Sequence, residues 1–173
     1  MTTVYVKTGD ITKAVSVDAI VTLINPGGMW WGGLDNAIMH VAGTIYHSQA
    51  RAIPLTDGQV VVAKRHGRQH SGSFNDVLFV VDDLRLPLSD LMFSALRETQ
   101  IEGYRSIAFP MMRTGVMLGA FEPNIRAVVE QMRAAIDKFT HLYPDSDLKI
   151  YIVVYNDPEA ENILLEDGSM VKI

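Results

Sequence analysis

Two short segments of this chain are apolar at every position and not only at alternate ones. They are Ala19-Ile20-Val21 and Ile150-Tyr151-Ile152-Val153-Val154. A strand that is apolar on both faces needs cover on both sides of its sheet, as in parallel sheets that lie between layers of helices. The two segments therefore predict an α/β fold with three layers, an α/β/α sandwich.

The rest of the chain alternates between strand-like and helix-like segments. The strand-like segments are rich in Val, Ile, Tyr and Phe and span residues 3–7, 19–24, 59–64, 77–81, 106–109 and 149–155. Apolar residues recur at helical spacing in residues 37–45, 89–100 and 125–139. Residues 64–72 have the composition of a hairpin tip, which implies some antiparallel pairing. We expect a central mixed, mostly parallel sheet of about six strands.

The composition is that of one domain with a continuous core. The chain has 173 residues, of which 48% are hydrophobic, and we expect residues 1–173 to form a single domain. It has no cysteine, which excludes disulfides, thiolate metal sites and cysteine nucleophiles. The apolar segments are too short to span a membrane, and residues 1–7 lack the pattern of a secretory signal. We therefore expect a cytoplasmic protein.

The formal net charge of −5 disfavours a protein that binds nucleic acid by neutralising many phosphates. One basic segment, Lys64-Arg65-His66-Gly67-Arg68-Gln69-His70, remains as a candidate RNA-binding patch. It lies between two strand-like segments and directly before Ser71-Gly72-Ser73, as expected of a solvent-exposed hairpin tip. We favour the hairpin tip and expect no nucleic-acid partner.

The first of two glycine-containing loops follows the strand-like residues 19–24, at the end of a strand where open α/β sheets bind their ligands. It reads Asn25-Pro26-Gly27-Gly28-Met29-Trp30-Trp31-Gly32-Gly33-Leu34-Asp35-Asn36. Glycines let backbone N–H groups approach an anion, and the helix that follows adds its positive N-terminal end. We expect a phosphate-binding loop, although a tight turn with Asp35 as the helix N-cap would use the same residues. The loop matches neither a Walker A loop nor the G-x-G-x-x-G fingerprint, which disfavours ATPases and dehydrogenases.

The second loop follows the strand-like residues 106–109 and precedes the longest helical segment. It reads Pro110-Met111-Met112-Arg113-Thr114-Gly115-Val116-Met117-Leu118-Gly119-Ala120. Two such loops at neighbouring strand ends are able to hold a diphosphate from opposite sides. Each charge-assisted N–H bond would contribute about 1.5–3 kcal/mol before desolvation is subtracted.

The order and spacing of these elements resemble the macrodomain family, over residues 9–156. The matching segments are Gly9-Asp10-Ile11-Thr12, Val17-Asp18-Ala19-Ile20-Val21, Asn25, Gly32-Gly33-Leu34-Asp35-Asn36-Ala37-Ile38, Pro54-Leu55-Thr56-Asp57-Gly58-Gln59-Val60, Ile107-Ala108-Phe109-Pro110 and Thr114-Gly115-Val116. The resemblance implies that residues 1–173 are a single macrodomain, a fold that binds ADP-ribose, and it is strongest to the hydrolytic MacroD-like branch.

The resemblance also implies a role for individual residues. Asp10 would accept a hydrogen bond from the adenine amino group, assisted by the backbone of Ile11, and Asn25 would face the distal ribose. Tyr155 would stack on the adenine, and Asn156 follows it. The diphosphate would be held by Gly32, Gly33 and Leu34 on one side and by Thr114, Gly115, Val116 and Met117 on the other.

Asp35 distinguishes an enzyme from a module that only binds ADP-ribose. In the hydrolytic branch the matching acid lies beside the distal ribose and directs or deprotonates a water, with Asn25 as the second catalytic candidate. A general base contributes about 10²–10⁴-fold when its geometry is right. The alternative is that Asp35 only caps the helix.

Several residues depart from the family pattern. Thr22 replaces the first Asn of the Asn-x-x-Asn element, Trp30-Trp31 is bulky for a phosphate loop, and Met117-Leu118 stands where an aromatic residue and a glycine are common. Residues 77–83 also lack the His that is often found there. These departures put hydrolysis in doubt more than binding.

We therefore expect ADP-ribose binding with hydrolysis of an ADP-ribosyl ester or related linkage, a mono-ADP-ribosyl hydrolase. The alternatives are a non-catalytic ADP-ribose reader and an ADP-ribose 1″-phosphate phosphatase. We expect no cofactor and no metal, since His40 and His47 lie seven residues apart without a third ligand, and we interpret both as helix-surface or interface residues. The expected partner of this monomer is ADP-ribose or an ADP-ribosylated macromolecule, without a membrane.

Overall fold

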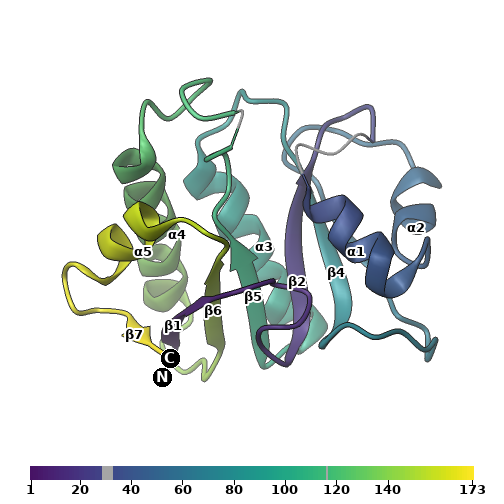
Figure 1. Ribbon diagram of the computed structural model, residues 1–173, viewed down its shortest axis with the longest axis horizontal. Helices are drawn as coiled ribbons and strands as arrows, with labels where there is room; N and C mark the ends of the chain where they lie inside the picture. The colour runs from purple at the N-terminus through teal and green to yellow at the C-terminus, as the bar shows by residue number, and fades with distance from the viewer. Residues whose placement is uncertain (29–32, 116) are drawn as a thin grey trace.

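The computed structural model describes residues 1–28, 33–115 and 117–173, and its strands form one sheet in the order β3-β4-β2-β5-β6-β1-β7 (Figure 1). The strands are β1 (Thr3–Thr8), β2 (Val17–Ile24), β3 (Val60–Ala63), β4 (Phe74–Val81), β5 (Ser106–Pro110), β6 (Lys149–Val154) and β7 (Val171–Lys172). Each of these neighbouring pairs is parallel except β3 and β4, which are antiparallel. The mixed, mostly parallel sheet is confirmed, with β7 as a strand that the sequence pattern did not predict.

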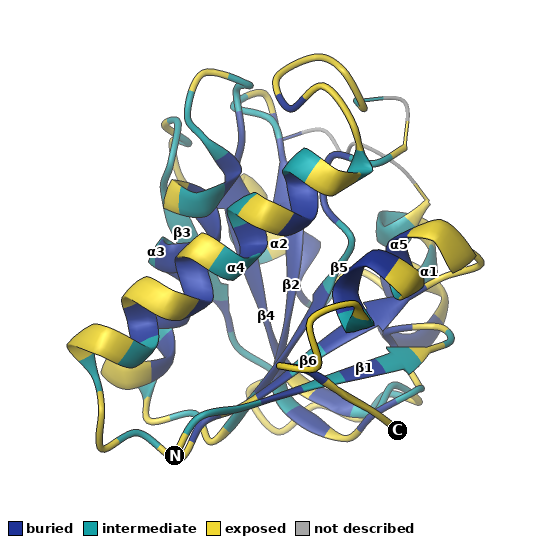
Figure 2. Ribbon diagram, turned by 90° about the vertical axis from the view of Figure 1, so that its left-hand side faces the viewer, coloured by how far each residue is buried: buried dark blue, intermediate teal, exposed yellow. Residues whose placement is uncertain are grey.

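Helices cover both faces of this sheet, as predicted. On one face lie α3 (Leu88–Glu102), α4 (Ile125–Leu142) and α5 (Pro158–Leu165), and on the other lie α1 (Leu34–Ala42) and α2 (His47–Arg51). Figure 2 shows buried residues along the central strands and on the inner sides of the helices, with exposed residues on the outer sides. No helix in the described residues is long and apolar enough to cross a membrane.

Strand β2 explains why some segments are apolar at every position. Its Ala19 and Val21 belong to the core cluster under α3, α4 and α5, whereas Ile20 and Ile24 belong to the cluster under α1 and α2. Because successive side chains of a strand point to opposite faces, both sets are buried only when both faces are covered.

The connection from β1 to β2 crosses a sheet face without a helix. Strands β5 and β6 lie between β1 and β2, so residues 9–16 pass over them. Ile11 and Val15 of this connection are buried in the same cluster as Ala108 of β5 and Val153 of β6. Helices α1 and α2 therefore share this face with a compact loop.

The first helical segment is divided, contrary to the prediction. Helix α1 ends at Gly43, whose φ of 60° lies in the left-handed region that favours glycine, and α2 begins at His47. His40 and His47 therefore lie on different helices. His40 is exposed, but His47 is buried with its ring edge-on to Phe79, so its interpretation as a surface or interface residue was wrong.

Helix α5 was also missed, although its start carries a sequence signal. The side chain of Asp157 accepts a hydrogen bond from the N–H of Ala160 at 3.1 Å, and Pro158 follows the cap directly. An acceptor side chain followed by proline is a typical helix start. Only three residues separate β6 from this helix, so the helix fixes the direction in which the chain leaves that strand.

Candidate ligand-binding site

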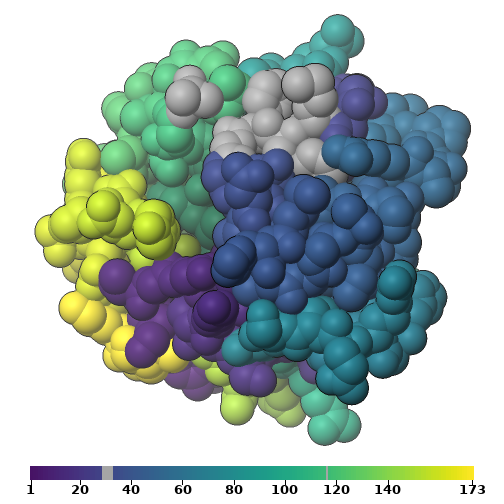
Figure 3. Space-filling view, turned by 45° about the vertical axis from the view of Figure 1, so that its right-hand side comes forward, coloured from purple at the N-terminus to yellow at the C-terminus, as the bar shows by residue number. Residues whose placement is uncertain are grey.

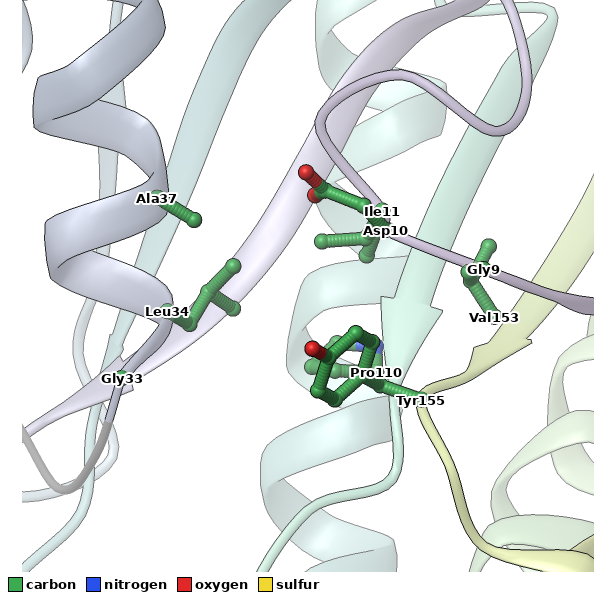
Figure 4. Close-up of a pocket in the computed structure, with 9 residues that line it drawn as sticks. All are labelled: Gly9, Asp10, Ile11, Gly33, Leu34, Ala37, Pro110, Val153 and Tyr155. Atoms are coloured by element: carbon green, nitrogen blue, oxygen red, sulfur yellow. The ribbon is translucent and has the colours of Figure 1, made fainter.

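A cavity of about 520 Å³ lies at the carboxyl ends of β5 and β6, between α1 and the β1–β2 connection. Its lining residues are Gly9, Asp10, Ile11, Gly33, Leu34, Ala37, Pro110, Val153 and Tyr155 (Figure 4). Figure 3 shows the same face of the molecule, with the blue surface of α1 on one side of the hollow. The volume lies within the range of about 300–1,000 Å³ that is usual for small-molecule sites.

The β1–β2 connection forms one wall and holds Asp10 in place. The N–H of Gly9 donates to the carbonyl of Val154 at 3.0 Å, which extends the pairing of β1 with β6. Oδ1 of Asp10 then accepts hydrogen bonds from the N–H of Thr12 at 2.9 Å and from its hydroxyl at 2.7 Å. Oδ2 takes part in neither bond, so Asp10 presents an anchored carboxylate at the cavity.

Gly9 permits the sharp bend that brings Asp10 to the cavity. Its φ of 147° is rarely adopted by other residues, and a Cβ at this position would lie 3.2 Å from the Cβ of Ala14. The carbonyl of Asp10 then accepts from the N–H groups of Lys13 and Ala14, which closes one helical turn. The wall is thus fixed by backbone geometry on both sides of Asp10.

Helix α1 forms the opposite wall. Leu34 and Ala37 point from its first turns toward Asp10 and Ile11 (Figure 4). The N-cap residue is Gly33, without a side-chain cap, and Asp35 lies in the first turn. The alternative in which Asp35 is the N-cap is therefore wrong, although an acid in the first turn still interacts favourably with the positive end of the helix.

Gly33 leaves its backbone open toward the cavity. A Cβ built at Gly33 would meet no atom of the described residues within 4 Å, and the same holds for Gly115 of the second loop. Neither glycine has a positive φ. Packing among the described residues therefore does not require glycine at these two positions, whereas close approach of a ligand to the backbone would.

Tyr155 stands at the rim of the cavity, directly after β6, and is 78% exposed. Figure 4 shows Tyr155 and Pro110 among the residues that line the cavity. Asn156 follows with a φ of 51° and is exposed, and it does not line the cavity. An exposed aromatic ring at a cavity rim provides a flat apolar surface for a planar ligand group.

Asn25 follows β2 directly and is half-buried. Its carbonyl accepts from the N–H of Gly28 at 2.9 Å, which turns the chain away from the sheet. Thr22, three residues earlier, is buried within β2 and paired in register with Phe79 of β4. Asn25 lies outside the lining of the cavity.

The second loop is held by a buried ionic network. The guanidinium of Arg113 donates to both oxygens of Asp82, from Nε at 2.9 Å and from Nη2 at 2.7 Å. Its Nη1 donates to both oxygens of Glu122 at 2.8 and 3.0 Å, and Nη2 also donates to the carbonyl of Leu86 at 2.8 Å. The side chain of Arg113 is only 1% exposed. Arg113 therefore turns inward, and the loop presents no free cation at this position.

Burial by itself would lower the pKa of Arg113, but the hydrogen bonds to Asp82 and Glu122 outweigh this effect and raise it. The ring of Phe121 lies under the guanidinium, with Cζ 5.0 Å from the ring centroid. Residues 77–83 lack the family's His, and they contain Asp82, one of the two carboxylates that Arg113 contacts. Sequence reasoning missed Arg113, although a lone cation in a glycine-containing loop was a visible signal.

The predicted site residues fall into three groups. The structure brings Asp10, Ile11, Gly33, Leu34 and Tyr155 together around the cavity. The other described ones lie outside its lining, namely Asn25, Asp35, Thr114, Gly115, Met117 and Asn156. Gly32 and Val116, like Trp30 and Trp31, lie outside the described residues. The lining residues that were not assigned a role are Gly9, Ala37, Pro110 and Val153.

The basic hairpin tip is partly neutralised within the protein. Nζ of Lys64 lies 2.9 Å from Oε2 of Glu102, and Nε of Arg65 donates to the carbonyl of Arg68. Nε2 of His70 lies 2.7 Å from the hydroxyl of Tyr46. In the described part of the chain, no group of three His, Asp or Glu side chains is placed to hold a metal ion.

Comparisons with known proteins identify relatives of this chain. No protein-family model matches the chain. The O-acetyl-ADP-ribose deacetylase of Escherichia coli (strain K12) is 28% identical, over 96% of this chain and 98% of the relative. The O-acetyl-ADP-ribose deacetylase of Citrobacter rodentium is 33% identical, over 65% of this chain and 68% of the relative.

Solved macrodomain structures share the fold. A Trypanosoma brucei macrodomain in complex with ADP-ribose has a TM-score of 0.78 and 21% identity, over 95% of this chain and 68% of that chain. An Oceanobacillus iheyensis macrodomain with ADP has a TM-score of 0.70 and 21% identity, over 94% and 88%. Sequence similarity and fold agree, and the chain belongs to the macrodomain family.

Proposed function

We propose that this protein binds ADP-ribose in the cavity between α1 and the β1–β2 connection and hydrolyses an ADP-ribosyl ester. The observation that carries the proposal is the near full-length similarity to proteins named O-acetyl-ADP-ribose deacetylase, whose substrate is an ester of ADP-ribose. A cavity at the carboxyl ends of the strands, of a size suited to a nucleotide, supports it.

We assign the ends of the ligand from the two walls. Asp10 accepts a hydrogen bond from the adenine amino group through Oδ2, with the backbone of Ile11 beside it, and Tyr155 and Asn156 flank the base. The backbones of Gly32, Gly33 and Leu34 hold one side of the diphosphate. Thr114, Gly115, Val116 and Met117 hold the other side. The open space in front of Gly33 and Gly115 supports this assignment.

We assign the chemistry to Asp35, with Asn25 orienting the distal ribose. Asp35 takes a proton from a water molecule, which attacks the acyl carbon of the ester. The bond from this carbon to the ribose oxygen breaks and the oxygen takes up a proton, so that ADP-ribose and a carboxylate are released. For a protein-linked ADP-ribose the same water would attack the anomeric carbon. A positioned base supplies about 10²–10⁴-fold of the rate.

A non-catalytic ADP-ribose reader is the second candidate. One observation favours it: Thr22, which replaces the family's first Asn, is buried in β2. A reader would keep the adenine and diphosphate contacts and lack turnover. Binding and hydrolysis therefore need separate measurements.

Calorimetry with ADP-ribose tests the binding. We expect a dissociation constant in the micromolar range, near −8 kcal/mol, and much weaker binding of AMP, which lacks the second phosphate and the distal ribose. Equal affinity for AMP and ADP-ribose would contradict the assignment of two loops to the diphosphate.

Acetate release from O-acetyl-ADP-ribose, followed by NMR, tests the hydrolysis. Two further substrates define the reaction: an acidic protein carrying one ADP-ribose, and ADP-ribose 1″-phosphate. Release of phosphate alone would assign a phosphatase. Firm ADP-ribose binding without release from any of the three would assign a reader.

We also infer that residues 1–173 form one macrodomain that acts as a monomer without a nucleic-acid partner. One sheet takes strands from Thr3 to Lys172, which supports a single domain. The internal contacts of Lys64 and His70 reduce the charge that the hairpin tip would offer to phosphates. Salt-dependent RNA binding would contradict this inference.

A further inference from the structure

The network of Asp82, Arg113 and Glu122 joins two separate segments at the carboxyl edge of the sheet. Asp82 follows β4, Arg113 lies in the loop after β5, and Glu122 lies near the end of that same loop. Four hydrogen bonds of 2.7–3.0 Å connect Arg113 to the two carboxylates. Arg113 therefore fixes its loop to the end of β4 and fixes the two ends of the loop to each other.

The same network reaches the base of the first loop. The N–H of Asp82 donates to the carbonyl of Ile24 at 2.7 Å, at the last residue of β2. Asn25 and the first loop follow directly. Oδ1 of Asp82 also accepts from the N–H of Leu84 at 2.9 Å, so its carboxylate is held at both oxygens. A continuous chain of bonds thus runs from the base of the first loop to the second loop.

Stability alone does not explain why this network is buried. Arg113, Asp82 and Glu122 have side chains that are 1%, 1% and 4% exposed, and two carboxylates face one guanidinium. Removing such charges from water opposes folding, and apolar residues of similar size often serve equally well. A bidentate guanidinium, however, specifies direction as well as distance. Arg113 also has a φ of 59°, a left-handed conformation that non-glycine residues rarely adopt.

We propose that Arg113, Asp82 and Glu122 are positioning residues that hold the second loop, and through it the N–H groups of Thr114 and Gly115, in the geometry that binds a diphosphate. The proposal rests on the proposed function, since the diphosphate is that of ADP-ribose. Arg113 acts through the loop and does not contact the ligand. The three residues therefore determine the affinity for the diphosphate and leave the affinity for the adenine unchanged.

The variant R113K tests this separation. Lysine keeps the charge, so the buried carboxylates keep a cation, but its single ammonium cannot form two bidentate pairs in opposite directions. We expect R113K to weaken ADP-ribose binding about tenfold or more, because the loop must then be ordered on binding. Adenosine, which has no phosphate, is expected to bind R113K and wild type equally by ligand-observed NMR.

The matched control is R126K. Arg126 also forms a bidentate pair, with Glu166 at 2.7 and 2.9 Å, but this pair is exposed and joins α4 to the residue after α5. We expect R126K to bind both ligands as wild type does. Equal ADP-ribose affinity in R113K and wild type would overturn the proposal, as would a parallel loss of adenosine binding.

The variant E122Q decides the question if R113K does not fold. Gln keeps the shape of Glu but turns an NH₂ group toward one donor of Arg113, so we expect ADP-ribose to bind about threefold more weakly. Unchanged binding would overturn the proposal. Tighter ADP-ribose binding would also overturn the proposal. It would mean that the negative charge of Glu122 weakens binding more than its hydrogen bonds to Arg113 strengthen it.

A ligand-free measurement separates this proposal from the proposed function. Failure of wild type to bind ADP-ribose would refute the proposed function alone. Amide exchange of Thr114 and Gly115 then tests the positioning, with faster exchange expected in R113K than in wild type and R126K. Equal exchange in all three proteins would overturn the proposal.

Discussion

The two walls of the cavity present different groups to a ligand. The β1–β2 wall presents the side chain of Asp10, anchored by two hydrogen bonds from Thr12. The α1 wall presents the uncapped start of a helix, where Gly33 has no side chain and Asp35 lies in the first turn. Under the proposed function, one wall recognises ADP-ribose through a side chain, and the other recognises it through backbone N–H groups. Substitutions should therefore weaken binding in opposite ways. On the β1–β2 wall, binding should be weakened by removing side-chain atoms, and on the α1 wall by adding them.

The largest effect is expected at Asp35, the one assigned side chain on the α1 wall. Asp35→Ala should lower turnover of O-acetyl-ADP-ribose by about 10²–10⁴-fold, because it removes the proposed base. ADP-ribose affinity should change by less than about tenfold, since the backbone supplies the diphosphate contacts in the proposed site. Steady-state kinetics and calorimetry on the same sample measure both quantities.

The control for Asp35 is its exposed neighbour on α1, through Asn36→Ala, which should leave turnover unchanged. An Asp35→Ala protein with normal turnover per folded molecule would remove Asp35 from the chemistry. Its melting temperature would then report only the loss of a first-turn acid, about 0.3–1 kcal/mol.

On the β1–β2 wall, Asp10→Asn should weaken ADP-ribose binding by about 1–3 kcal/mol, because the amide nitrogen replaces the acceptor offered to adenine. Asn keeps an oxygen for the two bonds from Thr12, so the turn and the melting temperature should be preserved. Asp10→Ala would lose those bonds as well, at a stability cost of about 0.5–2 kcal/mol. Calorimetry with ADP-ribose and NMR with adenosine should show the same loss for Asp10→Asn. A loss confined to ADP-ribose would place the adenine elsewhere.

The sequence predicted one wall better than the other. Asp10 and Ile11 follow a strand whose end is visible in the composition, and the structure places both at the cavity. The first helix is divided at Gly43, which has a left-handed conformation. Apolar residues keep their helical spacing through residues 37–45, so the periodicity gave no sign of this break. His47 was misassigned for this reason. Local patterns thus predicted the strands and long helices, and failed where one residue redirects a helix.

The second loop shows a different limit. Its position in the chain was predicted, but the inward direction of Arg113 was not. Arg113 and Asp82 are 31 residues apart in sequence, and their pairing depends on which strands are neighbours. Periodicity and composition contain no information on such pairing. A lone arginine in a glycine-containing loop is therefore visible in the sequence, but the direction in which its side chain points is not.

A smaller effect is expected from adding one methyl group to the α1 wall. Gly33→Ala should weaken ADP-ribose binding by about tenfold, because its Cβ would occupy space in front of the backbone N–H groups. Stability should change by less than about 1 kcal/mol, since the φ of −74° suits alanine. Adenosine binding should stay unchanged, in contrast to Asp10→Asn. Equal losses of both ligands would mean that the two walls do not divide the ligand as proposed.

The smallest expected effect is a pH dependence of stability, and it is confined to the layer of α1 and α2. Burial lowers the pKa of His70 from its ordinary value of 6.5, and nearby Arg65 adds to this effect. Nδ1 of His70 accepts from the N–H of Gly72 at 3.1 Å, so Nε2 carries the proton and donates to the hydroxyl of Tyr46, which in turn donates to the carbonyl of Asn75. This chain of bonds attaches the start of α2 to the β3–β4 connection, and it requires neutral His70.

The sign of the effect follows from proton binding. Because the folded-state pKa lies below 6.5, the unfolded chain binds more protons just below that pH, and the free energy of unfolding falls as the pH falls through it. Burial lowers the pKa of His47 in the same layer, with Arg51 adding to the shift and Asp35 opposing it, so it contributes in the same direction.

Chemical denaturation at several pH values measures this dependence. His70→Gln should reduce the slope of the free energy of unfolding against pH below pH 6.5. Amide exchange then locates the effect: acid should speed exchange at Ile38 and Val41 of α1 more than at Val6 of β1. Equal acceleration at all three amides would show that acid lowers the free energy of opening equally in both walls of the cavity.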